Sequence, residues 1–269
     1  MIKLAVAGAG GRMGQRLLAL SDKDPQFQLT QAIEWAEFPL LGQEVNANAP
    51  LAPRANGIKW TGALTADADV LVDFSAPEST AANAKEAARL GIALVAGATG
   101  LSDEQEDAIR EAGKTVPVIH APNYSLGVNL MFKLAAEAAR VFGDEYNIEI
   151  VEAHHNQKVD APSGTALGIL RAVAEPLGRS PKEDAVYGRS GRPGKRTQKE
   201  IGMHSLRMGS IAGDHTVHFC SEYECFSITH HAESRDVFVS GALRAAKWIV
   251  AQKPGYYTMQ DMLFGAADK

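Results

Sequence analysis

The sequence has few cysteines, no long apolar run and no excess of positive charge. Cys220 and Cys225 are too few for a disulfide framework and are not spaced as a CxxC pair, so we expect free thiols in a reducing compartment. No apolar run reaches the length of a membrane span. Glycines and Arg12 interrupt the N-terminal apolar stretch before a signal-peptide core could form. We therefore expect a cytoplasmic protein with no membrane partner.

The charge balance argues against nucleic acid as a partner, because the net charge is −5 at pH 7. One basic cluster, Arg189 to Lys199, is interrupted by glycine and proline. This composition favours a solvated loop, and a charged lip beside an acidic substrate is the alternative. With 269 residues, 45% of them hydrophobic, the chain has enough core for one large or two modest domains.

Strands and helices alternate along the first half of the chain. Short apolar runs of this kind are typical of strands buried in a parallel sheet. The predicted strands are Ile2–Ala7, Gln28–Ile33, Asp69–Phe74, Ile92–Ala96 and Val116–His120, and helices are predicted over Gln15–Ser21, from Pro77 to Leu90 and from Asp103. The alternation predicts an α/β fold with a Rossmann-type, doubly wound parallel sheet.

The pattern changes after Gly143, where strands follow one another with a single helix, Thr165–Leu177, among them. The predicted strands are Asn147–Ala153, Ile201–Met208, Thr216–Cys220 and Glu224–His231. They predict a second, α+β domain with an open mixed sheet. A last helical pattern, Val239–Gln252, is expected to return to the first domain.

A glycine-rich turn, Gly8-Ala9-Gly10-Gly11-Arg12-Met13-Gly14, joins the first predicted strand to the first helix. Glycines allow close approach of a pyrophosphate, and a helix N-terminus favours its charge. The spacing is GxxGxxG, not GxGxxG. Glu34 ends the second strand, where a carboxylate can bind ribose hydroxyls. The pattern indicates a nicotinamide dinucleotide site, and an ordinary tight turn is the alternative.

The residues after Glu34 bear on the choice of cofactor. Trp35 and Ala36 follow it, whereas a 2′-phosphate requires Arg or Lys there. This favours NADH, and Arg12 in the turn leaves NADPH open. Three further turns, Phe74–Pro77, Gly97–Gly100 and Ala121–Ser125, end predicted strands and are expected at the same crevice; ordinary βα turns are the alternative.

Residues 152–166 concentrate two imidazoles, an ammonium group and two carboxylates between a strand and a helix. His154 and Lys158 can supply protons and positive charge. Ser163 is a candidate N-cap, and backbone N–H groups at Gly164 and Thr165 could receive an anion. The stretch predicts a catalytic loop that acts on a carboxylate.

Together these motifs resemble the dihydrodipicolinate reductase family of bacterial lysine biosynthesis. The resemblance is carried by the turn Gly8–Gly14, Gly97-Ala98-Thr99-Gly100, Ala121–Asn129, the stretch Glu152–Ala166, Arg207-Met208-Gly209 and Gly213-Asp214-His215-Thr216. It implies NAD(P)H-dependent reduction of 4-hydroxy-tetrahydrodipicolinate, a cyclic dicarboxylate, to tetrahydrodipicolinate, with hydride from nicotinamide C4. It also implies a homotetramer.

The resemblance further implies residue roles. His154 and Lys158 would be catalytic, and His155, Lys158, Gly164 and Thr165 would bind the substrate. The implied cofactor contacts are Gly8, Ala9, Gly10, Gly11, Arg12, Met13, Glu34, Gly97, Ala98, Thr99, Ala121, Pro122, Asn123 and Tyr124. Which of His154 and Lys158 delivers the proton stays open, as does the order of dehydration and reduction.

Together the turn and the loop imply a dinucleotide-binding domain over residues 1–126, a substrate-binding and catalytic domain over 127–236, and a C-terminal segment over 237–269 that returns to the first domain.

Four other classes of protein share some of these features. In a zinc hydrolase, His215 and His218 would have to converge, but on a strand they point to opposite faces, so we expect no metal. A serine acyl transferase built on Ser163 would need a GxSxG elbow. A non-catalytic dinucleotide sensor would not need His154 and Lys158. A reductase of the aspartate-semialdehyde or homoserine type would have a different second-domain loop.

Overall fold

The computed structural model describes residues 1–45 and 57–265 and divides the chain into two compact units. The first comprises Met1–Tyr124 and Phe238–Lys269, and the second comprises Ser125–Val237. The last four residues of the expected C-terminal segment, 266–269, lie outside the described residues.

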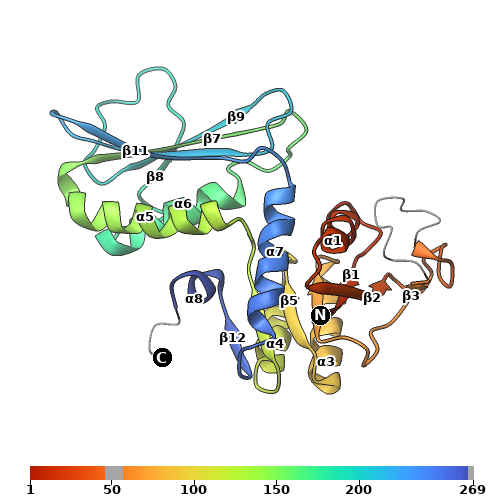
Figure 1. The fold of residues 1–269 in the computed structure, drawn as a ribbon. Helices are drawn as coiled ribbons and strands as arrows, with labels where there is room; N and C mark the ends of the chain where they lie inside the picture. The colour runs from red at the N-terminus through yellow and green to blue at the C-terminus, as the bar shows by residue number, and fades with distance from the viewer. Residues whose placement is uncertain (46–56, 266–269) are drawn as a thin grey trace. The chain divides into compact units, whose positions relative to one another are not determined.

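The first unit contains a seven-stranded parallel sheet (Figure 1). Its strands are β1 (Ile2–Ala7), β2 (Phe27–Ile33), β3 (Trp60–Thr61), β4 (Val70–Asp73), β5 (Ala93–Ala96), β6 (Pro117–His120) and β12 (Gly255–Tyr257). Their order is β12-β6-β5-β4-β1-β2-β3, so the sheet is wound outward from β1 in both directions. This is the doubly wound arrangement that the sequence predicts.

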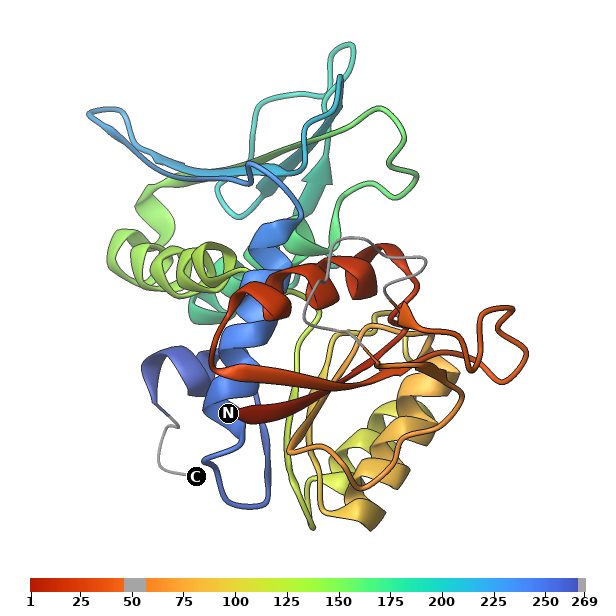
Figure 2. The same cartoon turned by 45° about the vertical axis from the view of Figure 1, so that its right-hand side comes forward.

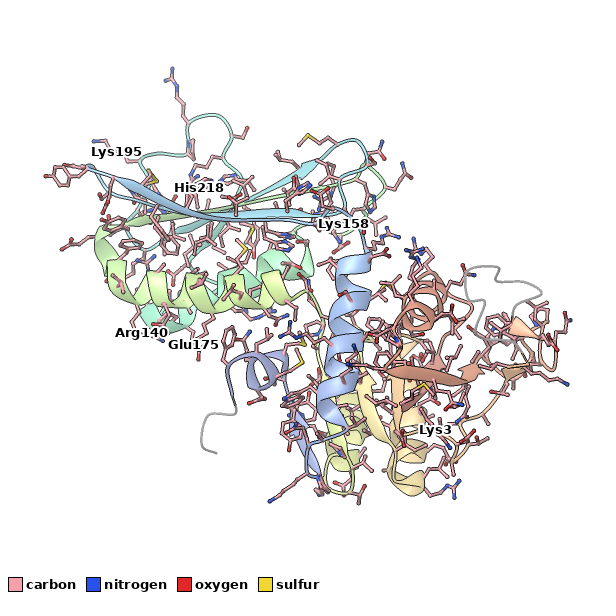
Figure 3. All side chains as sticks on the ribbon, viewed as in Figure 1. Lys3, Arg140, Lys158, Glu175, Lys195 and His218 are labelled. Atoms are coloured by element: carbon pink, nitrogen blue, oxygen red, sulfur yellow. A yellow bond between two sulfur atoms is a disulfide. The ribbon has the colours of Figure 1, made fainter. Side chains whose placement is uncertain are left out.

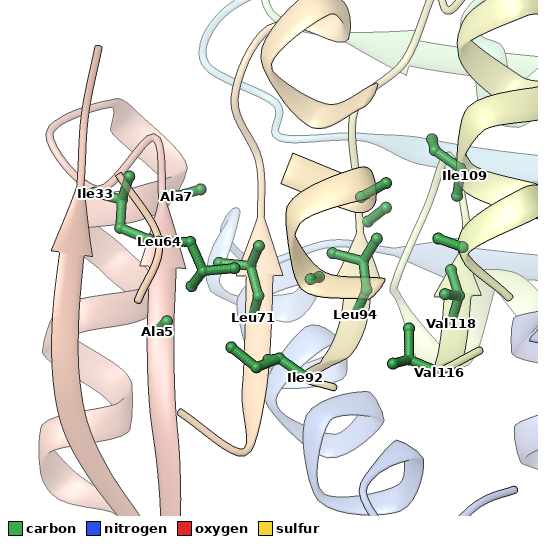
Figure 4. Packing of buried hydrophobic residues seen from close by; sticks show 14 residues of the cluster. Ala5, Ala7, Ile33, Leu64, Leu71, Ile92, Leu94, Ile109, Val116 and Val118 are labelled. Carbon is green, nitrogen blue, oxygen red and sulfur yellow. The ribbon is translucent and has the colours of Figure 1, made fainter. Parts of the chain in front are cut away.

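Helices α1 (Arg12–Lys23), α3 (Pro77–Leu90) and α4 (Asp103–Ala112) connect these strands, and α7 (Asp236–Ile249) and α8 (Met259–Phe264) belong to the C-terminal segment. The strands are buried because both faces of the sheet are covered; all four residues of β4 and of β5 are buried. Figure 4 shows part of this core, in which Leu71 and Leu94 of the sheet pack with Ile109 of α4. Removing this apolar surface from water stabilises the unit.

The second unit contains a five-stranded mixed sheet of order β11-β10-β7-β9-β8. Its strands are β7 (Asn147–His154), β8 (Ala185–Tyr187), β9 (Ile201–Arg207), β10 (Asp214–Cys220) and β11 (Cys225–His231). Helices α5 (Leu126–Phe142) and α6 (Gly164–Ala174) lie against one face of it (Figures 1 and 2). The expected α+β unit with an open mixed sheet is confirmed, and short 3₁₀ turns follow both helices.

The prediction of two free thiols is wrong. Cys220 ends β10 and Cys225 begins β11, and the two residues are directly paired across the antiparallel hairpin. Their Cα atoms are 4.1 Å apart and their sulfur atoms form a disulfide. The spacing of five residues does not by itself predict this disulfide, because the two cysteines are seen to be opposite each other only when the register of the hairpin is known.

Candidate active site

The glycine-rich turn forms one wall of a cavity of about 760 Å³ in the first unit. At Gly14 a Cβ atom would lie 2.5 Å from the Cα atom of Ala9, so only glycine lets the start of α1 pack against the turn. Gly8 adopts a left-handed conformation with φ of 67°, which glycine accepts without strain. The cavity is lined by Ala7, Gly8, Gly10, Gly11, Ile33, Glu34, Trp35, Phe38, Gly62, Phe74, Ser75, Ala76, Ser79, Ala82 and Asn83.

Glu34 is connected to the turn by a hydrogen bond. The backbone N–H of Gly10 donates to its carboxylate over 2.6 Å. Phe38 also lies close to Gly10: a Cβ atom at Gly10 would be 3.1 Å from both the Phe38 ring and the Glu34 carboxylate. Trp35 is 55% exposed and also lines the cavity. A carboxylate, backbone N–H groups and aromatic rings at one cavity suit a ribose, a phosphate and a heterocyclic base.

Asp73, at the end of β4, holds the next turn in place. Its fully buried carboxylate accepts hydrogen bonds from the backbone and hydroxyl of Ser75, from the Thr80 hydroxyl and from the Asn83 amide, at 2.6 to 3.1 Å. Phe74, between Asp73 and Ser75, faces the cavity. The network therefore fixes one wall of the cavity, a role that sequence reasoning missed.

The other two predicted turns support this wall. A Cβ atom at Gly97 would lie 2.5 Å from Cζ of Phe74 and still nearer Cε1, so glycine is needed for the two turns to meet. Tyr124 is buried, its ring is 5.7 Å from that of Phe74, and its hydroxyl donates to the carbonyls of Ala96 and Ile119. The structure thus gives the Tyr124 side chain a packing role, and burial raises the pKa of its hydroxyl.

Of the predicted cofactor residues, Gly8, Gly10, Gly11 and Glu34 line the cavity. Ala9, Arg12, Met13, Gly97, Ala98, Thr99, Ala121, Pro122, Asn123 and Tyr124 are outside its lining. Arg12 is exposed at the start of α1.

In the second unit, the sheet face toward the helices changes from apolar to polar along β7. Ile148 and Ile150 of β7 pair with Ile201 and Met203 of β9, and these four residues are buried in the core. Two residues further along, Glu152 is flanked by His215 of β10 and by Ser205 of β9. The row beyond pairs His154 with Arg207. The register of the strands thus brings the polar residues of three strands together.

Glu152 is the centre of this polar cluster and has no exposed surface. Arg207 donates to both of its oxygens, at 2.9 and 3.0 Å, and the backbone N–H of Ser163 donates at 3.2 Å. Nδ1 of His154 lies 2.5 Å from Oε2. Burial opposes ionisation of Glu152, but the hydrogen bonds from Arg207, Ser205 and His154 outweigh it and lower the pKa of the carboxyl group.

The two buried histidines of the cluster are held neutral. Burial lowers the pKa of His154, Glu152 opposes this shift, and the charges of Lys158 and Arg207 add to it. Burial lowers the pKa of His215 to about 3, with a further contribution from His154. The two rings are 5.2 Å apart and pack edge to face.

The predicted substrate residues lie on the loop after β7 and at the start of α6. Nζ of Lys158, labelled in Figure 3, lies 2.8 and 3.0 Å from the carboxylate oxygens of Asp160 and lowers the pKa of that carboxyl group. Nε2 of His155 lies 3.5 Å from Arg235, so the two adjacent histidines have different surroundings.

Ser163 caps α6, as predicted. Its hydroxyl accepts a hydrogen bond from the N–H of Ala166 and lies 3.0 Å from Nε2 of His215. A Cβ atom at Gly164 would meet nothing within 4 Å, so the first turn of the helix borders open space. The structure therefore brings Glu152, His154, Ser163 and the start of α6 together, with Lys158 on the connecting loop.

Sequence reasoning assigned no role to Glu152, Arg207 or His215. The spacing of Glu152 and His154, two residues apart on one strand, could have placed both side chains on one face. The positions of Arg207 and His215 beside Glu152 could be predicted only from the register of the sheet. His218 lies on the opposite face of β10 from His215, as predicted.

The basic cluster forms a loop after β8 in the structure. Arg189 and Arg196 pair there with Glu149 and Glu200 at 2.6 to 3.1 Å. These ion pairs fix the loop against the outer face of β7. Among the described residues, no group of His, Cys, Asp and Glu side chains is arranged to hold a metal ion, and none of the described helices is long and apolar enough to cross a membrane.

A parallel sheet of this strand order, a glycine-rich first turn and an acidic residue at the end of β2 together define a Rossmann-type dinucleotide-binding enzyme. Two family models match its halves: dihydrodipicolinate reductase, N-terminus, over residues 2–124, and dihydrodipicolinate reductase, C-terminus, over residues 127–263. The chain belongs to the dihydrodipicolinate reductase family, whose members use NAD(P)H. The resemblance noted in the sequence is confirmed.

Curated relatives match over nearly their whole length. The chain is 46% identical to the 4-hydroxy-tetrahydrodipicolinate reductase of Syntrophotalea carbinolica, covering 98% of this chain and 99% of the relative. It is 45% identical to the reductase of the same name from Magnetococcus marinus, covering 97% and 98%.

Solved structures share the fold. A dipicolinate-bound dihydrodipicolinate reductase from Paenisporosarcina sp. TG-14 superposes with a TM-score of 0.76 at 23% identity, covering 98% of this chain and 99% of that one. An amine dehydrogenase from Mycobacterium smegmatis follows the same fold with a TM-score of 0.61 at 12% identity.

Proposed function

We propose that this chain reduces 4-hydroxy-tetrahydrodipicolinate to tetrahydrodipicolinate in lysine biosynthesis, with His154 and Lys158 as its catalytic residues. The family assignment supports the reaction. The observation that supports the site is the cluster of Glu152, His154 and Arg207 beside the N-terminus of α6. The relative bound to dipicolinate supports a cyclic dicarboxylate as the ligand class.

The first unit would bind the cofactor. Gly8, Gly10 and Gly11 leave room for a pyrophosphate at the start of α1, and the Glu34 carboxylate is placed to accept hydrogen bonds from ribose hydroxyls. When bound, the nicotinamide supplies the hydride. The remaining predicted contacts, at Ala9, Arg12, Met13 and the turns after β5 and β6, would act through the backbone or through support of Phe74.

The second unit would bind the substrate and supply the proton. Lys158, His155 and the backbone N–H groups of Gly164 and Thr165 would bind its two carboxylates, because cations and helix-start N–H groups favour negative charge. Net reduction with loss of the 4-hydroxyl consumes one hydride and one proton and releases water. His154 or Lys158 would deliver that proton.

A coupled assay tests the reaction and the role of Lys158. The substrate is generated in situ from pyruvate and aspartate semialdehyde by the upstream synthase. Oxidation of the cofactor is followed by the loss of the absorbance at 340 nm that all reduced nicotinamides show. We expect rapid oxidation by the wild type and a loss of about 100-fold or more in Lys158→Ala. Exposed Lys195, on the basic loop of the same unit, provides the control variant Lys195→Ala. No oxidation despite a confirmed substrate supply would refute the proposal.

We propose further that NADH is the preferred cofactor. Glu34 lines the cavity, where its carboxylate would repel a 2′-phosphate, and Trp35 supplies no compensating positive charge. We expect the wild type to have a higher kcat/KM with NADH than with NADPH, and Trp35→Arg to shift this ratio at least several-fold toward NADPH. A wild type that prefers NADPH would contradict the proposal.

The family resemblance supports a homotetramer, and we propose that the five-stranded sheet mediates it. Helices α5 and α6 pack on one face of this sheet, while Leu206 and His218 lie on the other, and Leu206 is 44% exposed. Light scattering after size exclusion should give a mass about four times the 28.7 kDa of the chain. A monomer at micromolar concentration would refute this.

A further inference from the structure

We infer that Glu152 and Arg207 are positioning residues for His154: they hold its imidazole in the tautomer that carries the proton on Nδ1 and leaves the lone pair of Nε2 free to take up a proton. From there His154 would pass the proton to the substrate, with the Glu152 carboxylate stabilising the imidazolium ion. The inference deepens the proposed function and rests on it for the catalytic consequence. The tautomer itself is a property of the free protein and can be measured without substrate.

The donors around Glu152 leave one consistent proton arrangement. Arg207 donates to Oε1 at 2.9 Å and to Oε2 at 3.0 Å, and Ser163 donates its backbone N–H to Oε1. Neither group can accept a hydrogen bond from a protonated carboxyl group, because a guanidinium ion and an amide N–H are donors only. The hydroxyl of Ser205 also hydrogen-bonds to Glu152 and can donate to it. With these donors on its two oxygens, the carboxyl group is ionised and can only accept from His154. The proton on Nδ1 therefore points at Oε2, 2.5 Å away.

Arg207 is itself fixed, so that it can hold the carboxylate in one orientation. It donates to the carbonyl oxygen of Asp160 at 2.7 Å and to that of Leu206 at 2.7 Å. The guanidinium thus connects β9, β7 and the loop that carries Lys158. A lysine at this position would supply the charge without the paired geometry.

The opposite side of the His154 ring is kept accessible. Nε2 has no hydrogen-bond partner among the residues that the structure describes. Gly213 lies beside it, and a Cβ atom there would be 3.1 Å from Nε2, so glycine keeps this space open. The edge-to-face contact with His215 at 5.2 Å sets the plane of the ring. The hydrogen bond at Nδ1 and the contact with His215 together fix the orientation of the ring, so Nε2 points in one direction.

Replacing Glu152 by glutamine should reverse the tautomer. The amide group must replace one of the two oxygens by an NH₂ group. At the Oε1 position the NH₂ group would face two N–H donors, from Arg207 and Ser163, that cannot accept from it. At the Oε2 position it would face only the N–H donor of Arg207, because His154 can change its tautomer and accept at Nδ1. The Ser205 hydroxyl can donate or accept, so it does not decide between the two positions. Glu152→Gln therefore places the proton on Nε2 and removes the lone pair there.

The experiment combines ¹⁵N NMR of histidine-labelled full-length protein with steady-state kinetics. His154 is assigned from the signals that disappear in His154→Gln. We expect a protonated Nδ1 and an unprotonated Nε2 in the wild type at pH 7.5, and the reverse in Glu152→Gln. We expect kcat to fall at least 100-fold in Glu152→Gln while KM changes less than about threefold. Arg207→Lys should fall between the wild type and Glu152→Gln in kcat.

Glu149 provides a matched control on the same strand. It also lies next to a histidine, with Nε2 of His204 at 2.8 Å, and pairs with Arg189 and Arg196, but on the opposite face of the sheet. Glu149→Gln should leave the His154 tautomer unchanged and kcat within about twofold. Thermal unfolding of both variants shows whether each is folded.

The outcomes separate the inference from the proposed function. A wild type with the proton on Nε2 would overturn the inference, even if Glu152→Gln did not fold. So would a folded Glu152→Gln that retained the wild-type kcat. A wild type with the expected tautomer that did not reduce the substrate would refute the proposed function alone.

Discussion

His215 shows how the fold changes the chemistry of one residue. Burial lowers its pKa from 6.5 to about 3, so the folded protein keeps it neutral at pH values where the unfolded chain protonates it. Its contribution to stability is fully present above pH 6.5 and is lost as the pH falls toward 3. His154 and His230 are shifted in the same direction, also chiefly by burial.

The prediction is that His215→Gln flattens the dependence of stability on pH. One group that binds a proton only when unfolded changes the free energy of unfolding by about 1.4 kcal/mol per pH unit. Between pH 6 and pH 5 the wild type should therefore lose about 1 kcal/mol more than His215→Gln, measured by urea unfolding. Most carboxyl groups titrate below this window. Equal losses in both proteins would contradict the prediction.

Sequence reasoning at this scale predicts His154 and Lys158 as catalytic residues but not the side chains they pair with. The two residues lie in one stretch, so their proximity could be predicted. The difference between them could not, because His154 pairs with Glu152 and Arg207 while Lys158 pairs with Asp160. Arg207 lies 55 positions from Glu152, and only the parallel pairing of β7 with β9 brings it there.

At the scale of elements, Ser163 links helix formation to the site. As the N-cap of α6 it satisfies one backbone N–H, and its hydroxyl also contacts His215. Ser102 caps α4 by the same kind of bond, to the N–H of Gln105, on the surface of the first unit. The two serines therefore separate the capping contribution from the contact with His215.

We predict that Ser163→Ala destabilises the protein more than Ser102→Ala. Loss of an N-cap costs about 1 kcal/mol in each variant. Ser163→Ala also leaves the buried Nε2 of His215 without its hydrogen bond, at an additional cost of about 1 kcal/mol or more. Urea unfolding measures both values, and only Ser163→Ala should raise KM for the substrate. Equal destabilisation and an unchanged KM would refute this reading of Ser163.

Most of the long elements were predictable, with α5 as the exception, and the shortest strands were not. β1 matches the predicted strand from Ile2 to Ala7, because an apolar run buried on both faces has a clear sequence signal. β3, β8 and β12 have only two or three residues, and pairing with a neighbouring strand defines them more than their own sequence does. No helix over the residues of α5 is predicted from the sequence, although Ser125 caps it.

At the scale of the whole molecule, the C-terminal segment completes the first unit. β12 pairs in parallel with β6, and α7 approaches the end of the first segment at Gly241. A Cβ atom at Gly241 would lie 2.8 Å from the carbonyl carbon of Tyr124 and even nearer its oxygen. Since these are backbone atoms, no side-chain rotation can relieve the contact.

We predict that Gly241→Ala lowers the melting temperature. Overpacking of this kind costs about 3 kcal/mol, which corresponds to about 6–12 °C for a protein of this size. The control is Gly164→Ala, whose Cβ atom meets nothing within 4 Å, and its melting temperature should stay within about 2 °C of the wild type. Differential scanning calorimetry measures both. An unchanged melting temperature in Gly241→Ala would show that α7 can move away from Tyr124 at no cost.

The return of the chain to its first unit has a consequence for biosynthesis. The ribosome releases the strands β1 to β6 first, but β12, which pairs with β6, emerges only after the whole second unit. The second unit is continuous in sequence, from Ser125 to Val237, and can complete its sheet while translation continues. The nascent parallel sheet of the first unit therefore has an unpaired edge at β6 until β12 is synthesised, so the part of the enzyme that is synthesised first is completed last.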